Sequence, residues 1–171
     1  AEVVKMRGKS PEETAMDLVI EDGSRVGTVY FLMNEDNVKR EAGLPWMSLG
    51  SDEASPAPEG VFLKSQSHPR AYGNTARFLG HYVRDEHALP LADAIRKMTL
   101  MPAQRLEARV PMMANKGRVK IGADADLTIV DPATVIDKST YEDATIPAAG
   151  IPFVIVGGQV VVDSGRVTTA R

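Results

Sequence analysis

Residues 45–52, PWMSLGSD, form an apolar run that ends in a carboxylate. The low polarity of residues 46–50 predicts a strand that is covered on both faces, as in a parallel sheet. Asp52 then stands at the carboxyl end of this strand, where α/β folds form their ligand crevices. A carboxylate in that place can bind a metal ion or carry a proton. The alternative is that Asp52 caps the turn that follows it.

The sequence upstream predicts alternating helices and strands. Ser10 and Glu13 form a capping-box pattern, which predicts a helix that runs to about Glu21. Residues 26–33, VGTVYFLM, predict a buried strand, and residues 35–42 predict a short helix after it. Strand, helix and strand at this spacing are typical of a βαβ unit in a parallel sheet.

A long irregular loop is predicted over residues 53–71, and such loops are usually functional or mobile. It contains His68 and Arg70, and Tyr72 follows it directly. The guanidinium of Arg70 could hold a substrate carboxylate through two hydrogen bonds, and His68 and Tyr72 are further candidates for substrate contact. The alternatives are a solvated basic patch around Arg70 and a helix that begins near Tyr72.

Helices continue beyond this loop. Asn74 is expected to cap one helix, and a second helix is expected after Pro90. The apolar face predicted for that second helix consists of three residues, Leu91, Ile95 and Met98. Pro102 is expected to interrupt the helix and to start a short new turn.

The pattern of apolar residues changes to that of strands from residue 118. Strands are predicted over residues 118–121, 127–130, 153–156 and 159–162. Gly157 and Gly158 separate the last two, and a two-glycine turn between apolar runs predicts a hairpin because both positions can adopt positive φ.

Composition excludes several classes of protein. Of 171 residues, 43% are hydrophobic and 25% are charged, which is typical of a soluble globular protein. The net charge of −3 gives no electrostatic basis for binding nucleic acid or an anionic membrane. The chain has no cysteine, so disulfides and thiolate metal sites are excluded. We expect a cytoplasmic location.

Several motifs together resemble the N-acyl-D-amino-acid deacylases (D-aminoacylases) of the amidohydrolase superfamily. The most specific are HPRAYG at residues 68–73 and LGHYVR at residues 79–84. The other segments that carry the resemblance are residues 25–31, 35–38, 45–52, 94–99, 102–103, 117–119, 122–127 and 131–132.

The resemblance implies an α/β fold in two parts. Residues 1–112 are expected to form the last units of an incomplete (β/α)₈ metal-dependent hydrolase barrel. Residues 113–171 are expected to form the C-terminal portion of a β-sandwich domain. A complete barrel needs about 250 residues, so the early barrel strands and their metal-binding histidines are expected to lie outside this chain.

The resemblance also implies a mechanism for the longer enzyme, in which zinc activates a water that attacks the amide bond of an N-acyl-D-amino acid. Asp52 matches the aspartate that takes a proton from this water and passes it to the leaving amine. It is expected to bind metal only if the remaining ligands come from outside this chain. The chain alone is therefore expected to bind no zinc and to be inactive.

Two other interpretations remain open. The chain could be a non-catalytic structural or interaction module, completed by a partner chain, by the missing barrel portion or by a second copy of itself. It could also be a fragment of a cyclic-amide hydrolase, although the His-Pro-Arg loop favours the deacylases.

Overall fold

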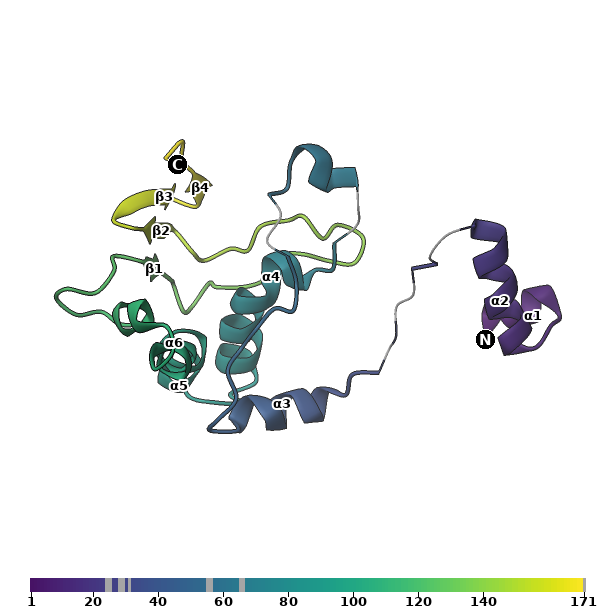
Figure 1. The fold of residues 1–171 in the computed structure, drawn as a ribbon, viewed down its shortest axis with the longest axis horizontal. Coiled ribbons are helices and arrows are strands. Elements are labelled where there is room, and N and C mark those ends of the chain that lie inside the picture. The colour runs from purple at the N-terminus through teal and green to yellow at the C-terminus, as the bar shows by residue number, and fades with distance from the viewer. Residues whose placement is uncertain (24–25, 28–29, 31, 55–56, 65–66, 171) are drawn as a thin grey trace. The chain divides into compact units, whose positions relative to one another are not determined.

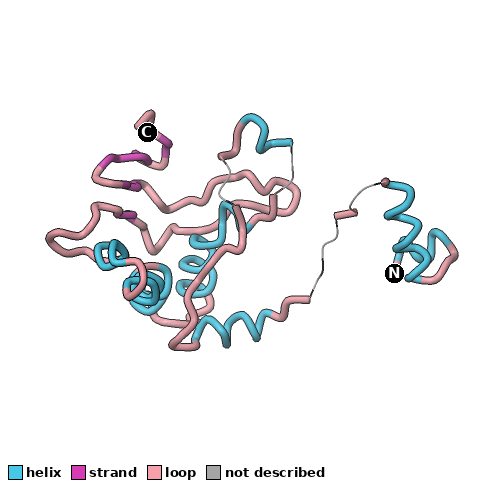
Figure 2. Tube along the Cα trace, in the orientation of Figure 1, coloured by secondary structure: helices cyan, strands magenta, loops and turns pink. Residues whose placement is uncertain are grey.

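The computed structural model describes residues 1–23, 26–27, 30, 32–54, 57–64 and 67–170 (Figure 1). By its internal contacts the chain divides into two units, Ala1–Asn34 and Glu35–Arg171. Figure 2 shows that, in the described residues, helices lie in the first two thirds of the chain and strands lie from Leu127 onward. Among the described residues, no helix combines the length and the apolar character needed to cross a membrane.

The first unit contains two helices, α1 (Glu2–Arg7) and α2 (Pro11–Asp22). The capping box predicted for α2 is confirmed, because the Ser10 hydroxyl accepts from the Glu13 N–H at 3.2 Å and the Glu13 carboxylate accepts from the Ser10 N–H. The helix ends at Gly23, which adopts a left-handed conformation with φ of 68°. The guanidinium of Arg7 donates two hydrogen bonds to the carboxylate of Glu21, and this ion pair joins the two helices.

The strand predicted over residues 26–33 is wrong for the residues that the structure describes, and residues 28, 29 and 31 lie outside them. Tyr30 and Met33 are 72% and 89% exposed, and none of the described residues in this range belongs to a strand. A strand is stable only where a neighbouring strand accepts its backbone hydrogen bonds. Sheet pairing in the described residues begins only at Leu127.

Helical segments make up the first part of the second unit, and the helix predicted over residues 35–42 is confirmed. In chain order the segments are α3 (Glu35–Gly43), η1 (Gly60–Lys64), α4 (Arg70–Arg77), η2 (Phe78–Asp85), α5 (Leu91–Met98), α6 (Leu100–Glu107) and η3 (Pro111–Asn115). In its described residues, the predicted loop over residues 53–71 thus contains the short 3-10 helix η1 and, from Arg70, the start of α4. Helix α5 stops before Pro102 and α6 begins at Leu100, which confirms the predicted interruption.

Two details of these helices differ from the predictions. Helix α4 begins at Arg70, so Asn74 lies inside the helix and does not cap it. On α5 the buried residues are Ala94 and Lys97, while Leu91 and Ile95 are 38% and 47% exposed. The face that α5 buries is chosen by its neighbours in the fold, which a single helix's apolar pattern does not specify.

The C-terminal part is a four-stranded antiparallel sheet in the order β1 (Leu127–Ile129), β2 (Phe153–Val156), β3 (Gln159–Asp163) and β4 (Arg166–Val167). Strands β2 and β3 form the predicted hairpin, with φ of 57° at Gly157 and 82° at Gly158. The acidic residue before β1, Asp126, accepts a 2.8 Å hydrogen bond from the Gly157 N–H, which ties β1 to the hairpin turn.

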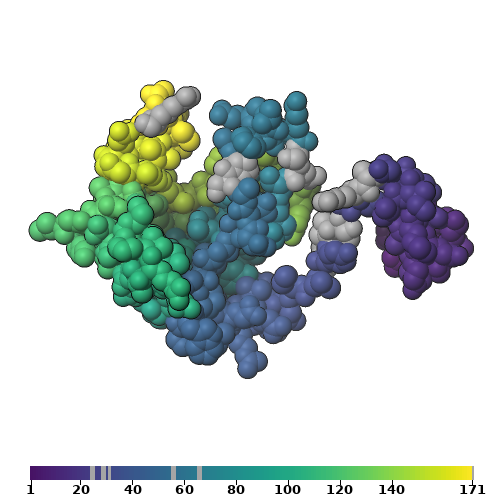
Figure 3. All heavy atoms as spheres, viewed as in Figure 1, coloured from purple at the N-terminus to yellow at the C-terminus, as the bar shows by residue number. Residues whose placement is uncertain are grey.

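The strand predicted over residues 118–121 is wrong. Val119 and Ile121 are 88% and 103% exposed, and neither pairs with a strand. Figure 3 shows the loop between η3 and β1 standing clear of the rest of the second unit. In the described part of the chain, no strand lies beside this loop to pair with it, so the apolar pattern of residues 118–121 does not produce a strand.

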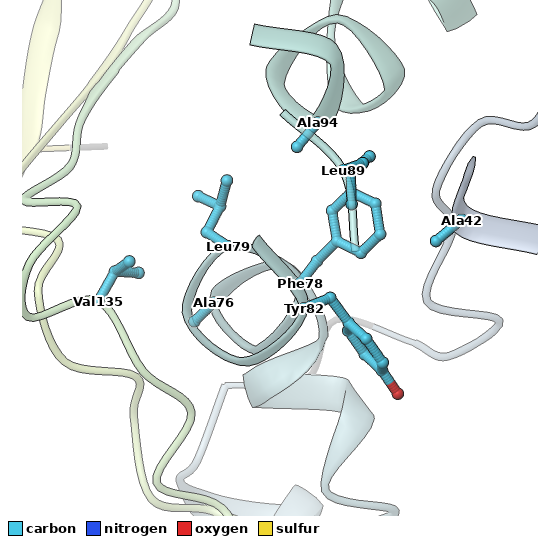
Figure 4. Packing of buried hydrophobic residues seen from close by; sticks show 8 residues of the cluster. All are labelled: Ala42, Ala76, Phe78, Leu79, Tyr82, Leu89, Ala94 and Val135. Carbon is cyan, nitrogen blue, oxygen red and sulfur yellow. The ribbon is translucent and has the colours of Figure 1, made fainter. Parts of the chain in front are cut away.

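The core of the second unit is built around η2. Phe78 points towards Leu89 and Ala94, while Val135 lies near Leu79 on another side of η2 (Figure 4). Gly80 permits this contact, because a Cβ atom there would lie 2.3 Å from the carbonyl oxygen of Val135. The segment after β1 is thereby packed directly on the helix that follows the His68–Arg70 loop.

Candidate functional site

The segment that leads to Asp52 is held by a helix, and the strand predicted over residues 46–50 is wrong. Trp46 is 75% exposed, and the backbone of the segment bonds to α5. The Leu49 N–H donates to the carbonyl of Lys97 at 3.3 Å, and the Lys97 ammonium donates to the carbonyls of Leu44 and Met47. In the described residues, this segment is therefore held by hydrogen bonds to α5 and not by pairing in the predicted βαβ unit.

Asp52 presents its carboxylate to solvent. Its backbone is left-handed, with φ of 50°, a conformation that Asp tolerates better than most residues. Its side chain is 98% exposed. A carboxylate with this exposure is accessible to a water molecule or a substrate.

Arg70 joins Asp52 to the start of helix α4. Its Nη2 donates to the carbonyl oxygen of Asp52 at 2.9 Å and lies 3.4 Å from the Asp52 carboxylate. Its Nε lies 3.3 Å from Glu53 Oε2, an ion-pair distance, but it is buried and is not aligned for a hydrogen bond with that oxygen. The structure thus brings two of the predicted site residues, Asp52 and Arg70, into contact.

His68 lies beside Arg70 in the chain and contacts a residue far away in sequence. Its Nδ1 accepts from the Arg70 backbone N–H at 3.1 Å, and its Nε2 lies 3.2 Å from the Tyr141 hydroxyl. The His68 and Tyr141 rings meet edge to face, with centroids 5.2 Å apart.

Tyr72 and Arg70 line the same pocket. This pocket has a volume of about 250 Å³ and includes Gly50 and Ser51 from the segment before Asp52, and Met98 from α5. A larger pocket of about 380 Å³ lies between α3, η2 and residues 47–50. Residues 49 and 50 line both pockets, so the segment that carries Asp52 separates two hollows of the second unit.

Three residues of the site lack a clear signal in the sequence. Glu53 pairs with Arg70. The only signal for this residue in the sequence is its position directly after Asp52. Tyr141 lies 73 positions from His68, and no local pattern relates the two. Lys97 is 3% exposed, although lysine is rarely buried. The only indication of its burial in the sequence is that it precedes Met98, a residue of the apolar face predicted for this helix.

The donor atoms present do not make a zinc site by themselves. Zinc sites use three or four His, Cys, Asp or Glu ligands. Across the described residues, no group of three such side chains is placed to hold a metal ion. Both nitrogens of His68 are engaged by Arg70 and Tyr141, and the nearest charged partner of Asp52 is a cation. Asp52 could serve only as one ligand among others supplied from outside these residues.

Comparison with known proteins gives consistent matches. A family model described as "Amidohydrolase family" matches residues 28–162. A D-aminoacylase from Alcaligenes xylosoxydans xylosoxydans is 38% identical over 157 residues, which is 92% of this chain and 29% of that protein.

Solved structures give the same result. A D-aminoacylase studied for its binuclear metal centre superposes with a TM-score of 0.80 at 35% identity, over 99% of this chain and 32% of that one. The N-acyl-D-glutamate deacylase of Bordetella bronchiseptica, complexed with zinc and a phosphonate inhibitor, gives a TM-score of 0.74 at 32% identity, over 97% of this chain and 32% of that one. The chain therefore spans about a third of the length of the relatives that it matches.

Proposed function

Because the chain belongs to the amidohydrolase family, we propose that it is part of a longer enzyme that hydrolyses the amide bond of N-acyl-D-amino acids. Support comes from a relative and solved neighbours named as D-aminoacylase and N-acyl-D-glutamate deacylase. The activity of the longer enzyme is a proposal, because this chain spans about a third of those relatives.

We propose that residues 1–112 correspond to the last units of the hydrolase barrel and residues 113–171 to part of a β-sandwich. The fold likeness to D-aminoacylase over 99% of the chain supports this division. The strands of the described residues also lie after residue 113, in one antiparallel sheet. Under this proposal, residues 46–50 form a strand only beside barrel strands that belong to the longer enzyme.

The contact between Asp52 and Arg70 is the observation that carries the proposal. It places a carboxylate that can move a proton next to a cation that can bind an anion. Hydrolysis of an N-acyl-amino acid needs both, because a proton must pass from water to the leaving amine and the substrate carries a carboxylate. Asp52 takes the proton from the attacking water and delivers it to the amine nitrogen as the C–N bond breaks.

Arg70 and Tyr72 are the proposed contacts for the substrate carboxylate. The Nε of Arg70 has no hydrogen-bond acceptor among the described residues, although it lies close to Glu53. The Arg70 side chain is 41% exposed although its Nε is buried, so a substrate carboxylate would bind the terminal Nη atoms of the planar guanidinium. Tyr72 lines the same pocket and can donate its hydroxyl proton to a carboxylate oxygen.

Zinc is proposed for the longer enzyme only. A solved neighbour is complexed with zinc, but the described residues of this chain do not assemble a set of ligands. We therefore expect the 171-residue chain alone to be inactive and to hold no zinc after dialysis.

The test compares the 171-residue chain with the longer protein that contains it. Both are assayed with the N-acetyl derivatives of D- and L-amino acids, and zinc is measured by elemental analysis. We expect D-selective hydrolysis and bound zinc in the longer protein and neither in the chain alone. Hydrolysis of cyclic amides but not of N-acyl-D-amino acids would overturn the proposed substrate, and zinc bound stoichiometrically by the chain alone would overturn the proposed inactivity.

A non-catalytic module that pairs with another chain is the second candidate. Apolar side chains on several segments are exposed in the second unit, among them Trp46 at 75%, Ile95 at 47% and Val119 at 88%. Exposed apolar surface of this kind favours association. Sedimentation velocity of the chain separates the two cases, because a monomer at all concentrations would count against the module.

A further inference from the structure

Both ring nitrogens of His68 are engaged within this chain. Nδ1 lies 3.1 Å from the backbone nitrogen of Arg70, which donates to it. Nε2 lies 3.2 Å from the hydroxyl oxygen of Tyr141. The edge-to-face contact of the two rings, at 81° between planes, holds the imidazole in one orientation.

The hydrogen-bond network assigns the tautomer of His68. A backbone N–H can only donate, so the Nδ1 atom that accepts from Arg70 must carry a lone pair. A neutral imidazole with an unprotonated Nδ1 has its proton on Nε2. That proton faces Tyr141, whose hydroxyl oxygen is the acceptor.

His68 also acts at the start of helix α4. The first N–H groups of a helix have no partner within the helix, and Pro69 at the cap position provides no side-chain hydrogen bond. The imidazole Nδ1 provides one for Arg70, the first residue of α4. Because the guanidinium of Arg70 also binds the Asp52 carbonyl, the cap and this bond together fix where Arg70 lies.

We propose that His68 is a positioning residue, oriented by Tyr141, that places Arg70 beside Asp52, and that it does not itself contact substrate. The link to substrate rests on the role proposed above for Arg70. The expectation that His68 binds substrate is replaced because neither ring nitrogen is left to do so. Tyr141 lies in the segment between β1 and β2. By orienting His68, it positions a loop that lies about 70 positions earlier in the chain.

The first test uses the 171-residue chain and does not depend on activity. Amide hydrogen exchange at Arg70 is measured by NMR in the wild type and in the His68→Ala and His68→Asn variants. We expect exchange about fivefold faster in His68→Ala, the factor that corresponds to the loss of a side-chain cap. His68→Asn should restore protection, because the Asn side-chain oxygen can replace Nδ1 as the acceptor.

The imidazole nitrogens provide a spectroscopic signature. Their ¹⁵N shifts, measured above the ordinary histidine pKa, should show protonated Nε2 and unprotonated Nδ1 at His68. Tyr141→Phe removes the acceptor and should speed Arg70 exchange by about threefold, in the range of one net hydrogen bond. His87→Asn, at an exposed histidine, is the control and should change neither signal. A proton on Nδ1, or Arg70 exchange that His68→Ala leaves unchanged, would overturn the proposal.

The second test uses the longer enzyme. Tyr141→Phe should raise KM for an N-acetyl-D-amino acid several-fold and leave kcat within about twofold, because it disturbs only the placement of Arg70. A fall in kcat with unchanged KM would contradict the positioning role. If the longer enzyme hydrolyses no such substrate, the proposed function fails, while the exchange and ¹⁵N measurements still decide the assignment of His68.

Discussion

The Lys97 ammonium lies 3.2 Å from the carbonyl oxygen of Met47 and also donates to that of Leu44. The Leu49 N–H returns a bond to the Lys97 carbonyl. These bonds join α5 to the segment that leads to Asp52, and Lys97 is 3% exposed. Its burial in the fold lowers the pKa of the amine. A buried cation thus supplies hydrogen bonds to a backbone segment that has no strand neighbour in the described residues.

Replacement of Lys97 tests this support. Lys97→Met keeps the length of the side chain and leaves the carbonyls of Leu44 and Met47 without their buried donor. We expect the free energy of unfolding to fall by about 1–3 kcal/mol, the cost of unsatisfied buried polar groups. Lys138→Met, at an exposed lysine, is the matched control and should change it by less than about 0.5 kcal/mol. Urea denaturation of both variants gives the comparison, and equal effects would refute the role of Lys97.

The same residue predicts a dependence of stability on pH. The Lys97 pKa is lowered in the folded chain, mainly by burial, from the ordinary value of 10.5. At pH values between the pKa of Lys97 in the folded chain and 10.5, the unfolded chain binds more protons than the folded chain does. The free energy of unfolding therefore increases as pH rises through this window. Denaturation of wild type and Lys97→Met from neutral pH to 10.5 should show their difference growing with pH. A constant difference would contradict the lowered pKa.

Gly150 is expected to be intolerant of a side chain. Its φ is 79°, and a Cβ atom there would lie 2.4 Å from the Cα and nitrogen of Val135, which is fully buried. Gly122 has a similar φ of 84° but has open space around it. Gly122→Ala should therefore cost only the backbone strain of about 1 kcal/mol, and Gly150→Ala should cost at least about 2 kcal/mol more. Thermal unfolding of the two variants isolates the steric part, and similar melting temperatures would rule out the close approach.

Asp52→Asn tests the proposed proton transfer in the longer enzyme. The amide keeps the size of the side chain but cannot accept and release the proton, so kcat should fall by about 10²–10⁴-fold. The KM should change much less, because the proposed contact with the substrate carboxylate is made by Arg70. Glu59→Gln removes an exposed carboxylate from the same loop and should leave both constants unchanged. Retained kcat in Asp52→Asn would exclude Asp52 as the proton carrier.

Two patterns that depend on neighbouring residues were predicted correctly. The capping box of α2 joins Ser10 and Glu13 within one turn, and the β2–β3 hairpin follows from two adjacent glycines. The capping box and the choice of turn residues depend on positions within three residues of each other, so tertiary packing has little influence on these signals. The strands predicted over residues 46–50 and over the described part of residues 26–33 failed because a strand needs a partner that its own sequence does not contain.

Local sequence thus determined where α2 and α5 begin, where the final hairpin turns and which motifs mark the amidohydrolase family. It also singled out Asp52, His68, Arg70 and Tyr72 as candidates. Only the tertiary structure brought Arg70 to Asp52, Tyr141 to His68 and Lys97 to residues 44–47, across separations of 18 to 73 positions. The reason is physical: such contacts depend on the path of the chain between them, and residue type alone does not specify that path.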